Sequence, residues 1–379
     1  MKRRKKTLFI GNIALAFMAL LCLALVFRLG GVLESQKAAE RWRGESGASF
    51  AQLSAFLPEG KDLSLEQIYQ FRQTLETKLT EASLKMQSDA GKEKETEPAE
   101  QGKPAIPEGL DLYIDAWSSV GEVNVSGERG SSKAEVTAVG GNYFYFHPLR
   151  LLSGSYLSEA DLMEDRVILD QDLAWKLFGG TDLAGMTVEI GGVPYMIAGV
   201  VERESDFATK RAYTAGGGLF MSYRAYMGMA QDAIECYEIV LPQPIGGFAE
   251  TLMKDSFPLN GGELVNNSQR FSPESLWQML RAFGTRSMQR SNVIYPYWEN
   301  AARFLGDWCA LAFALCLLFA LLPSLCGFIW LLAALIRVKD LLTKKLPQLV
   351  SQALDKRRMK RFLRQGAHEK SKEKSLKTQ

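Results

Sequence analysis

The stretch that decides the fold runs from Glu135 to Glu202 and reads EVTAVGGNYFYFHPLRLLSGSYLSEADLMEDRVILDQDLAWKLFGGTDLAGMTVEIGGVPYMIAGVVE. Within it, Val167–Leu169 is a short apolar run of the kind that forms a buried strand. Asp170 follows directly and predicts the N-cap of a short helix that places Leu173 and Leu177 on one face. The stretch therefore predicts a strand that leads straight into a capped helix.

Two glycine pairs divide the same stretch. Gly179-Gly180 predicts the end of the short helix, because glycine takes the left-handed conformation there at little cost. Gly191-Gly192 separates two β-rich runs, Thr187–Ile190 and Val193–Val201. This pattern predicts a two-residue hairpin, since a primed turn needs positive φ. A further β-rich run, Val136–Val139, lies near the start of the stretch.

An aromatic run and an acidic turn lie between these elements. Tyr143–Phe146 predicts a strand with one face in the core, and its exposed pair is a candidate protein interface. Ser158 precedes a cluster of four carboxylates and predicts a capped helical turn. The cluster consists of Glu159, Asp161, Glu164 and Asp165. It lacks the alternating ligands and the glycine of a calcium loop, so we expect a solvated helix start and no metal site.

Taken in order, the segments LLSGSYL, the acidic turn, VILD, AWKLFGG, DLAGMTVEI and PYMIAGVV resemble the extracytoplasmic core domain of MacB/FtsX-type ABC-transporter permeases. The resemblance is close over residues 135–202. It is looser over the whole chain, where those permeases also place this domain just after a first membrane helix. The resemblance implies a domain that binds or transmits, and it implies no catalytic, cofactor or metal-binding residues.

Charge is distributed unevenly along the 379 residues. The formal net charge is +2, but residues 2–6 carry +5 and residues 337–379 carry +10, which leaves −13 on residues 7–336. Basic ends around an acidic middle favour a membrane arrangement with both ends in the cytoplasm and argue against nucleic-acid binding.

Two apolar runs predict the membrane spans. Leu8–Phe27 is uncharged and long enough, at about 30 Å as a helix, to cross a bilayer. A secretory signal peptide is the alternative, but its apolar region is shorter and ends at a small-residue cleavage site, so we favour an uncleaved anchor. The second run, Trp308–Ile336, contains Pro323 and predicts one tilted, kinked helix. A two-span hairpin would need about 40 residues and would place the basic tail outside.

The chain between the spans predicts an α+β fold, a mixed domain of two small lobes. Residues 49–57 alternate as a strand, and Ser64 with Gln67 predicts a capping box at the start of a helix. Residues 233–241 predict another strand, and Ser272 predicts the cap of a helix that ends near Phe283. The helix after Ser64 carries one apolar stripe, made of Ile68, Phe71, Leu75 and Leu79.

The expected domain boundaries follow from these features. Residues 1–28 form the basic start and first span, 29–302 the extracytoplasmic domain, 303–337 the second span, and 338–379 a basic cytoplasmic tail. Residues 86–108 have no apolar periodicity, so we expect a flexible insert there.

Few residues in the sequence point to catalysis. Of the five cysteines only Cys236 falls in the outer domain, where a strand core position is expected. His147 would have to carry any Ser-His-Asp triad, and a packing role is the competing interpretation. The sequence contains no G-x-x-x-x-G-K-[ST], so the chain itself carries no P-loop ATPase. We therefore expect no enzyme activity and no cofactor.

Two functional hypotheses remain. The resemblance implies a permease-like subunit of the plasma (cytoplasmic) membrane that is driven by a separate ABC ATPase and acts on an envelope protein or substrate. The family norm is four spans with an ATPase-contacting loop, whereas this sequence shows two, so a companion permease is implied. The alternative is a membrane-anchored binding or assembly protein that retains the outer fold without ATP coupling. The basic segment after Pro347 is either a plain anchor or a docking helix for such a partner.

The charge distribution predicts the topology directly. In a chain whose native cysteines are replaced, Ser88→Cys should react with a membrane-impermeant maleimide added to intact cells, and Ser371→Cys should not. The opposite pattern, with labelling at position 371 but not at 88, would rule the topology out.

Overall fold

This computed structural model describes residues 2–44, 48–61, 63–93, 112–158, 164–213, 217–230, 233–283 and 295–341, together with residues 293, 343, 354, 356, 357 and 359. The chain divides into two compact units, one of residues 23–314 and one of residues 1–22 with 315–379. The first unit holds the folded domain, and the second holds the remaining parts of the apolar helices.

The helices, in chain order, are α1 (Lys2–Gly30), η1 (Glu34–Gln36), α2 (Ala38–Arg43), α3 (Leu65–Glu93), α4 (Tyr143–Phe146), α5 (Gln171–Leu177), α6 (Thr209–Ala212), α7 (Tyr223–Met227), α8 (Phe248–Ser256), η2 (Asn267–Gln269), α9 (Pro273–Arg281) and α10 (Tyr297–Asp340). The strands are β1 (Phe50–Phe56), β2 (Ile114–Gly127), β3 (Gly130–Gly141), β4 (Arg150–Gly154), β5 (Arg166–Asp170), β6 (Thr187–Ile190), β7 (Val193–Glu202), β8 (Gly218–Ser222), β9 (Cys236–Pro242) and β10 (Glu263–Asn266).

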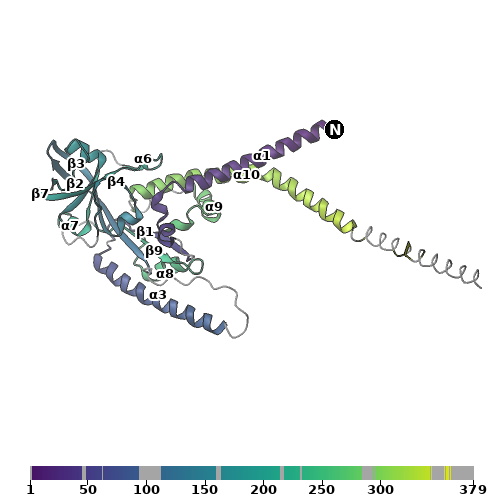
Figure 1. Ribbon diagram of the computed structural model, residues 1–379, viewed down its shortest axis with the longest axis horizontal. Helices are drawn as coiled ribbons and strands as arrows, with labels where there is room; N and C mark the ends of the chain where they lie inside the picture. The colour runs from purple at the N-terminus through teal and green to yellow at the C-terminus, as the bar shows by residue number, and fades with distance from the viewer. Residues whose placement is uncertain are drawn as a thin grey trace, which may run out of the picture. The chain divides into compact units, whose positions relative to one another are not determined.

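The ten strands of the described residues belong to one sheet, in the order β10-β1-β9-β2-β3-β8-β5-β7-β4. Strand β6 lies off this path and pairs with both β2 and β7. The strands β2, β3, β8, β5, β7 and β6 therefore close into a ring, which forms a barrel lobe. The strands β10, β1 and β9 continue from the first half of β2 as an open layer lobe (Figure 1).

Strand β2 joins the two lobes. Its first half, Ile114–Ser118, pairs with β9, whereas Val125 and Ser126 pair with β6, and β3 runs beside it from end to end. One strand thus carries the hydrogen-bond ladders of both lobes.

Helices cover both faces of the layer lobe. On one face Ala51, Leu53 and Ala55 of β1 belong to the same buried cluster as the α3 stripe. On the other face Phe50 and Phe56 pack in a second cluster. That second cluster also contains Ala38 and Ala39 of α2, Tyr143 and Phe146 of α4, and Trp298 of α10. The alternation of β1 was predicted, but its second face is covered as well, by segments distant in the sequence.

Several local predictions are confirmed. Ser64 and Gln67 exchange reciprocal hydrogen bonds of 3.2 and 3.0 Å, as a capping box requires. The Asp170 carboxylate accepts from the Leu173 N–H at 2.7 Å and caps α5. Gly191-Gly192 turns the β6–β7 hairpin with φ of 57° and 87°. The α+β class, flanked by two apolar helices, is also confirmed.

Other local predictions are wrong. Tyr143–Phe146 forms a helical turn rather than a strand, because Tyr143 and Phe146 are drawn into the core beneath α10 while the chain turns between β3 and β4. Helix α3 continues to Glu93, so the first part of the expected insert is helical. Its Lys, Met, Gln, Ala and Glu residues are good helix formers, so a helix forms there without apolar periodicity. Residues 94–108 of the insert and residues 159–163 of the acidic turn lie outside the described residues.

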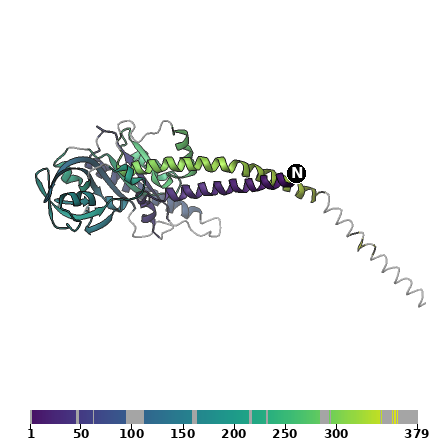
Figure 2. The ribbon, with the colours of Figure 1, turned by 90° about the horizontal axis from the view of Figure 1, so that it is seen from above.

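The described residues include two helices long and apolar enough to cross a bilayer, over Phe9–Gly30 and Tyr297–Lys339. The second is one continuous helix with Pro323 inside it, which agrees with a single span rather than a hairpin. Within the unit of residues 23–314, the last turns of α1 lie beside the first turns of α10 (Figure 2). There Val26 packs in one cluster with Cys309.

Candidate functional site

The base of α10, residues 297–305, is built into the core of the domain. Ala301, Ala302 and Leu305 are completely buried and pack with Leu33 and Ala208. Because the same helix continues as the second apolar span, its first two turns join the span to the domain without a flexible linker. We call residues 297–305 and the side chains that they contact the junction.

A buried carboxylate lies at the centre of the junction. Glu299 is 1% exposed, and its two oxygens accept from Arg270 and from Arg303, the latter at 2.8 Å. Arg303 also pairs with Glu263 of β10 at 2.8 Å, and Arg270 donates to the Asn267 side chain at 3.0 Å. A carboxylate removed from water must keep such partners, since leaving a buried charge unpaired costs several kcal/mol.

The chain of contacts continues into the sheet and returns to α10. The Asn267 amide donates to the Ser54 hydroxyl at 2.7 Å, and Ser54 donates to Glu238 at 3.0 Å. The other Glu238 oxygen lies 2.5 Å from Nε2 of His147. The His147 ring then packs on Trp298 with 4.3 Å between ring centroids. The circuit thereby ties together β1, β9, η2, the residue that follows α4, and the base of α10.

A second group of side chains, from residues 203–213 after β7, holds the same helix. Tyr213 stacks on Tyr297 with 4.5 Å between ring centroids. The Tyr213 hydroxyl donates to the Glu204 carboxylate at 2.9 Å. The Arg203 guanidinium lies 4.6 Å above the Tyr213 ring. Burial raises the pKa of the Glu204 carboxyl above its ordinary value, although the hydrogen bond from Tyr213 opposes this rise.

His147 and Cys236 occupy structural positions. Glu238 lies between Ser54 and His147, so the serine does not donate to the imidazole as a nucleophile–base pair requires. Both Ser54 and His147 are also fully buried. Cys236 is buried in β9, and burial raises the pKa of its thiol well above the ordinary value, which disfavours the reactive thiolate. Within the described residues, no group of three or more His, Cys, Asp or Glu side chains could hold a metal ion.

The members of the junction were not predicted from the sequence. Glu299 and Arg303 have the (i, i+4) spacing of an ordinary solvated helix pair, and both precede the apolar run. Their partners Arg270 and Glu263 lie about 30 residues away or more in loop and edge-strand segments. The available signal was a pair of opposite charges about one turn before the apolar run. This signal was not enough, because the role of the pair depends on its burial, which the sequence alone does not show.

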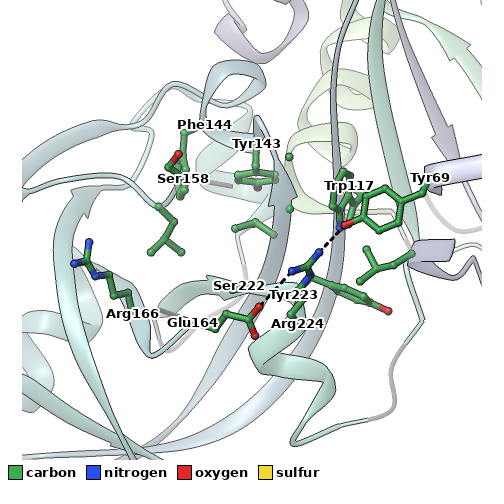
Figure 3. A pocket seen from close by; sticks show the side chains of 15 residues that line it. Tyr69, Trp117, Tyr143, Phe144, Ser158, Glu164, Arg166, Ser222, Tyr223 and Arg224 are labelled. Carbon is green, nitrogen blue, oxygen red and sulfur yellow. Dashed lines mark hydrogen bonds and ion pairs between the residues drawn. The ribbon is translucent and has the colours of Figure 1, made fainter. Parts of the chain in front are cut away.

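A cleft of about 220 Å³ lies between the two lobes (Figure 3). Tyr69 of α3 lines its layer side, and Arg224 of α7 and Glu164 line its barrel side. Arg224 donates to the Tyr69 hydroxyl at 2.7 Å and pairs with Glu164 at 3.7 Å, so these contacts bridge the two sides. Of the expected acidic turn, Glu164 is thus placed at the cleft.

The floor of this cleft depends on a glycine. A Cβ at Gly140 would lie 2.2 Å from the Trp117 indole, so the ring packs directly on the Gly140 backbone. The aromatic run contributes Tyr143 and Phe144 to the lining. The cavity is smaller than pockets for drug-sized ligands, roughly 300–1,000 Å³. Its size, its aromatic walls and its arginine suit a single side chain or a small planar group.

Comparison with known proteins gives a family match. Residues 60–241 match the model of the MacB-like periplasmic core domain. No curated protein matches the sequence.

Three solved structures are similar at low identity. The periplasmic region of MacB from Actinobacillus actinomycetemcomitans has 15% identity and a TM-score of 0.39, and the match covers 66% of this chain and 99% of that one. The extracellular domain of the noncanonic ABC-type transporter YknZ from Gram-positive bacteria has 12% identity and a TM-score of 0.35, with 57% and 99% covered. A domain of a putative permease protein from Porphyromonas gingivalis has 13% identity and a TM-score of 0.28, with 42% and 72% covered.

The raised pKa of Glu204 predicts a pH dependence of stability. The folded state retains the carboxyl proton at pH values where the unfolded chain has lost it. The resulting contribution to the free energy of unfolding is full below the ordinary glutamate pKa and is lost as the pH rises through the raised pKa. Glu204→Gln removes this dependence and retains an oxygen that accepts from Tyr213. Its stability relative to the native chain should therefore increase from about pH 4 to about pH 8.

Thermal melts of the detergent-solubilised full chain across that pH range test this expectation. Glu59→Gln, at an exposed position, is the matched control and should track the native chain. A Glu204→Gln advantage that stays constant or shrinks with rising pH would contradict the assignment.

Proposed function

We propose, from the MacB-like periplasmic core domain that residues 60–241 carry, that the chain is a membrane-anchored, permease-like subunit of the MacB/FtsX type. In this proposal the outer domain passes motion of the second span to an envelope partner or substrate. ATP hydrolysis is assigned to a separate ABC ATPase subunit, and the chain itself has no catalytic role.

The observation that carries the proposal is the burial of Glu299 between Arg270 and Arg303. If α10 slid or rotated against the sheet, these pairs would separate inside the core. Breaking a buried ion pair costs about 3–5 kcal/mol, because it leaves an uncompensated charge in the core. The domain is therefore expected to follow α10 as one piece, which is what transmission of a membrane motion requires.

The proposed topology places the lipid bilayer around residues 8–27 and 308–336. Residues 1–28 and 303–337 then hold the two spans, residues 29–302 lie outside the plasma membrane, and residues 338–379 form the cytoplasmic tail. The basic ends support this orientation, because cytoplasmic flanks carry an excess of Lys and Arg. A companion permease would supply the further spans that the family norm requires.

Purification of the tagged full-length chain from its native membrane tests the proposal first. An ABC ATPase and a second permease should co-purify. The chain without either would contradict ATP coupling and favour the alternative, an anchored binding or assembly protein.

The junction is tested in the purified complex by Glu299→Gln, which leaves the two arginines facing a neutral amide. ATP with vanadate should change hydrogen exchange in β1 and β9 of the native complex. In Glu299→Gln the ATPase should still co-purify. The nucleotide-dependent change in hydrogen exchange should then reach the base of α10 but be lost from β1 and β9. Glu250→Gln, which perturbs a pair with exposed Lys254, is the control. An undiminished change in Glu299→Gln would show that the junction is not the route.

A further inference from the structure

Helix α9 has one face in the fold and one face outward. Ser272 caps it, with its hydroxyl accepting from the Ser275 N–H at 3.2 Å, and Pro273 begins it. Leu276 is buried in a cluster with Val26 of α1 and with Cys309 and Ala312 of α10. The helix therefore packs directly on the two helices that form the apolar spans.

The depth of α9 follows from these partners. Val26 lies within the apolar part of α1, four residues before its end at Gly30. Cys309 directly follows Trp308, where the long uncharged run of α10 begins. Phe271, just before α9, lies so close to Gly30 that a Cβ there would be 3.1 Å from the ring. All of these contacts place α9 at the outer ends of the two spans.

The outward face of α9 is aromatic and basic. Trp277 is 45% exposed and Phe283, two residues past the end of the helix, is 60% exposed. The Arg281 guanidinium lies 5.3 Å from the centre of the Trp277 ring. Aromatic surface that stays in water contributes no free energy of burial. At the boundary between lipid headgroups and acyl chains, Trp buries its ring while Arg keeps its charge near the headgroups.

Another segment at the level of Trp308 shows the same chemistry. Phe207, also exposed, packs on Phe304 with 5.6 Å between ring centroids, and Arg211 lies 5.1 Å above the Phe304 ring. Trp308 itself is exposed and contacts Phe304. Phe207 from the segment before α6 thus meets Phe304 of α10 at the start of the apolar run. Aromatic side chains gather at the same level in the aromatic belt of membrane proteins.

We propose that α9 is an interfacial helix that lies in the outer surface of the bilayer. Trp277 and Phe283 enter the headgroup–acyl boundary, and the Arg281 guanidinium binds a phospholipid phosphate, whose oxygens match its planar donors. We assign lipid as the occupant because Leu276 packs α9 against Val26 and Cys309, at the ends of the two apolar spans. The inference depends on the two-span topology but not on any coupling to an ATPase.

Site-directed spin labels in the full chain test this placement. The five native cysteines are replaced, and the chain is reconstituted into vesicles of phosphatidylethanolamine and phosphatidylglycerol. Labels at Trp277→Cys and Phe283→Cys should be more accessible to oxygen than to a water-soluble nickel chelate. A label at Trp175→Cys is the matched control, because this tryptophan is 54% exposed on α5, and it should show the reverse preference.

A label at Leu318→Cys, an exposed position within the second apolar run, separates the possible failures. Lipid exposure at 318 with water exposure at 277 and 283 would overturn the interfacial helix and leave the span intact. Water exposure at 318 would overturn both. Labels at 277 and 283 that are shielded from both reagents would indicate a protein contact and would also overturn the proposal.

Discussion

The paired burial of Glu299 is the constraint on which the rest of the arrangement depends. A carboxylate at this depth is tolerable only while Arg270 and Arg303 remain in place, and each arginine is held in turn by a second partner. The base of α10 is therefore fixed in rotation and in height against β10 and η2. A hydrophobic contact alone would permit sliding, because apolar packing is not directional.

Strand β2 extends this constraint across the domain. It pairs with β9, which carries Glu238 of the buried circuit, and its far half belongs to the closed barrel. The cleft beside Tyr69 and Arg224 lies where the two lobes meet. Ladders of backbone hydrogen bonds therefore connect the strands beside α10 with the side of the domain that carries the cleft.

Local signals in the sequence predicted those elements whose formation depends on neighbouring residues. The Asp170 cap, the Gly191-Gly192 hairpin and the Ser64–Gln67 capping box all appear as expected. Elements set by distant contacts were missed. Strand β8 is a five-residue segment stabilised by β3 and β5, and Tyr143 enters a helical turn because Trp298 and His147 pack on it. The junction was missed for the same reason, since its charges look solvated until the fold buries them.

Native-state hydrogen exchange of the full chain in detergent tests the central claim, that α10 and the sheet move as one body. If α10 and the sheet move as one body, amides of residues 299–305 exchange only through the opening that also exposes β9. Both segments then show the same free energy of opening as denaturant is added. If residues 299–305 open at a clearly lower free energy than β9, the helix can move without the domain, which contradicts a rigid junction.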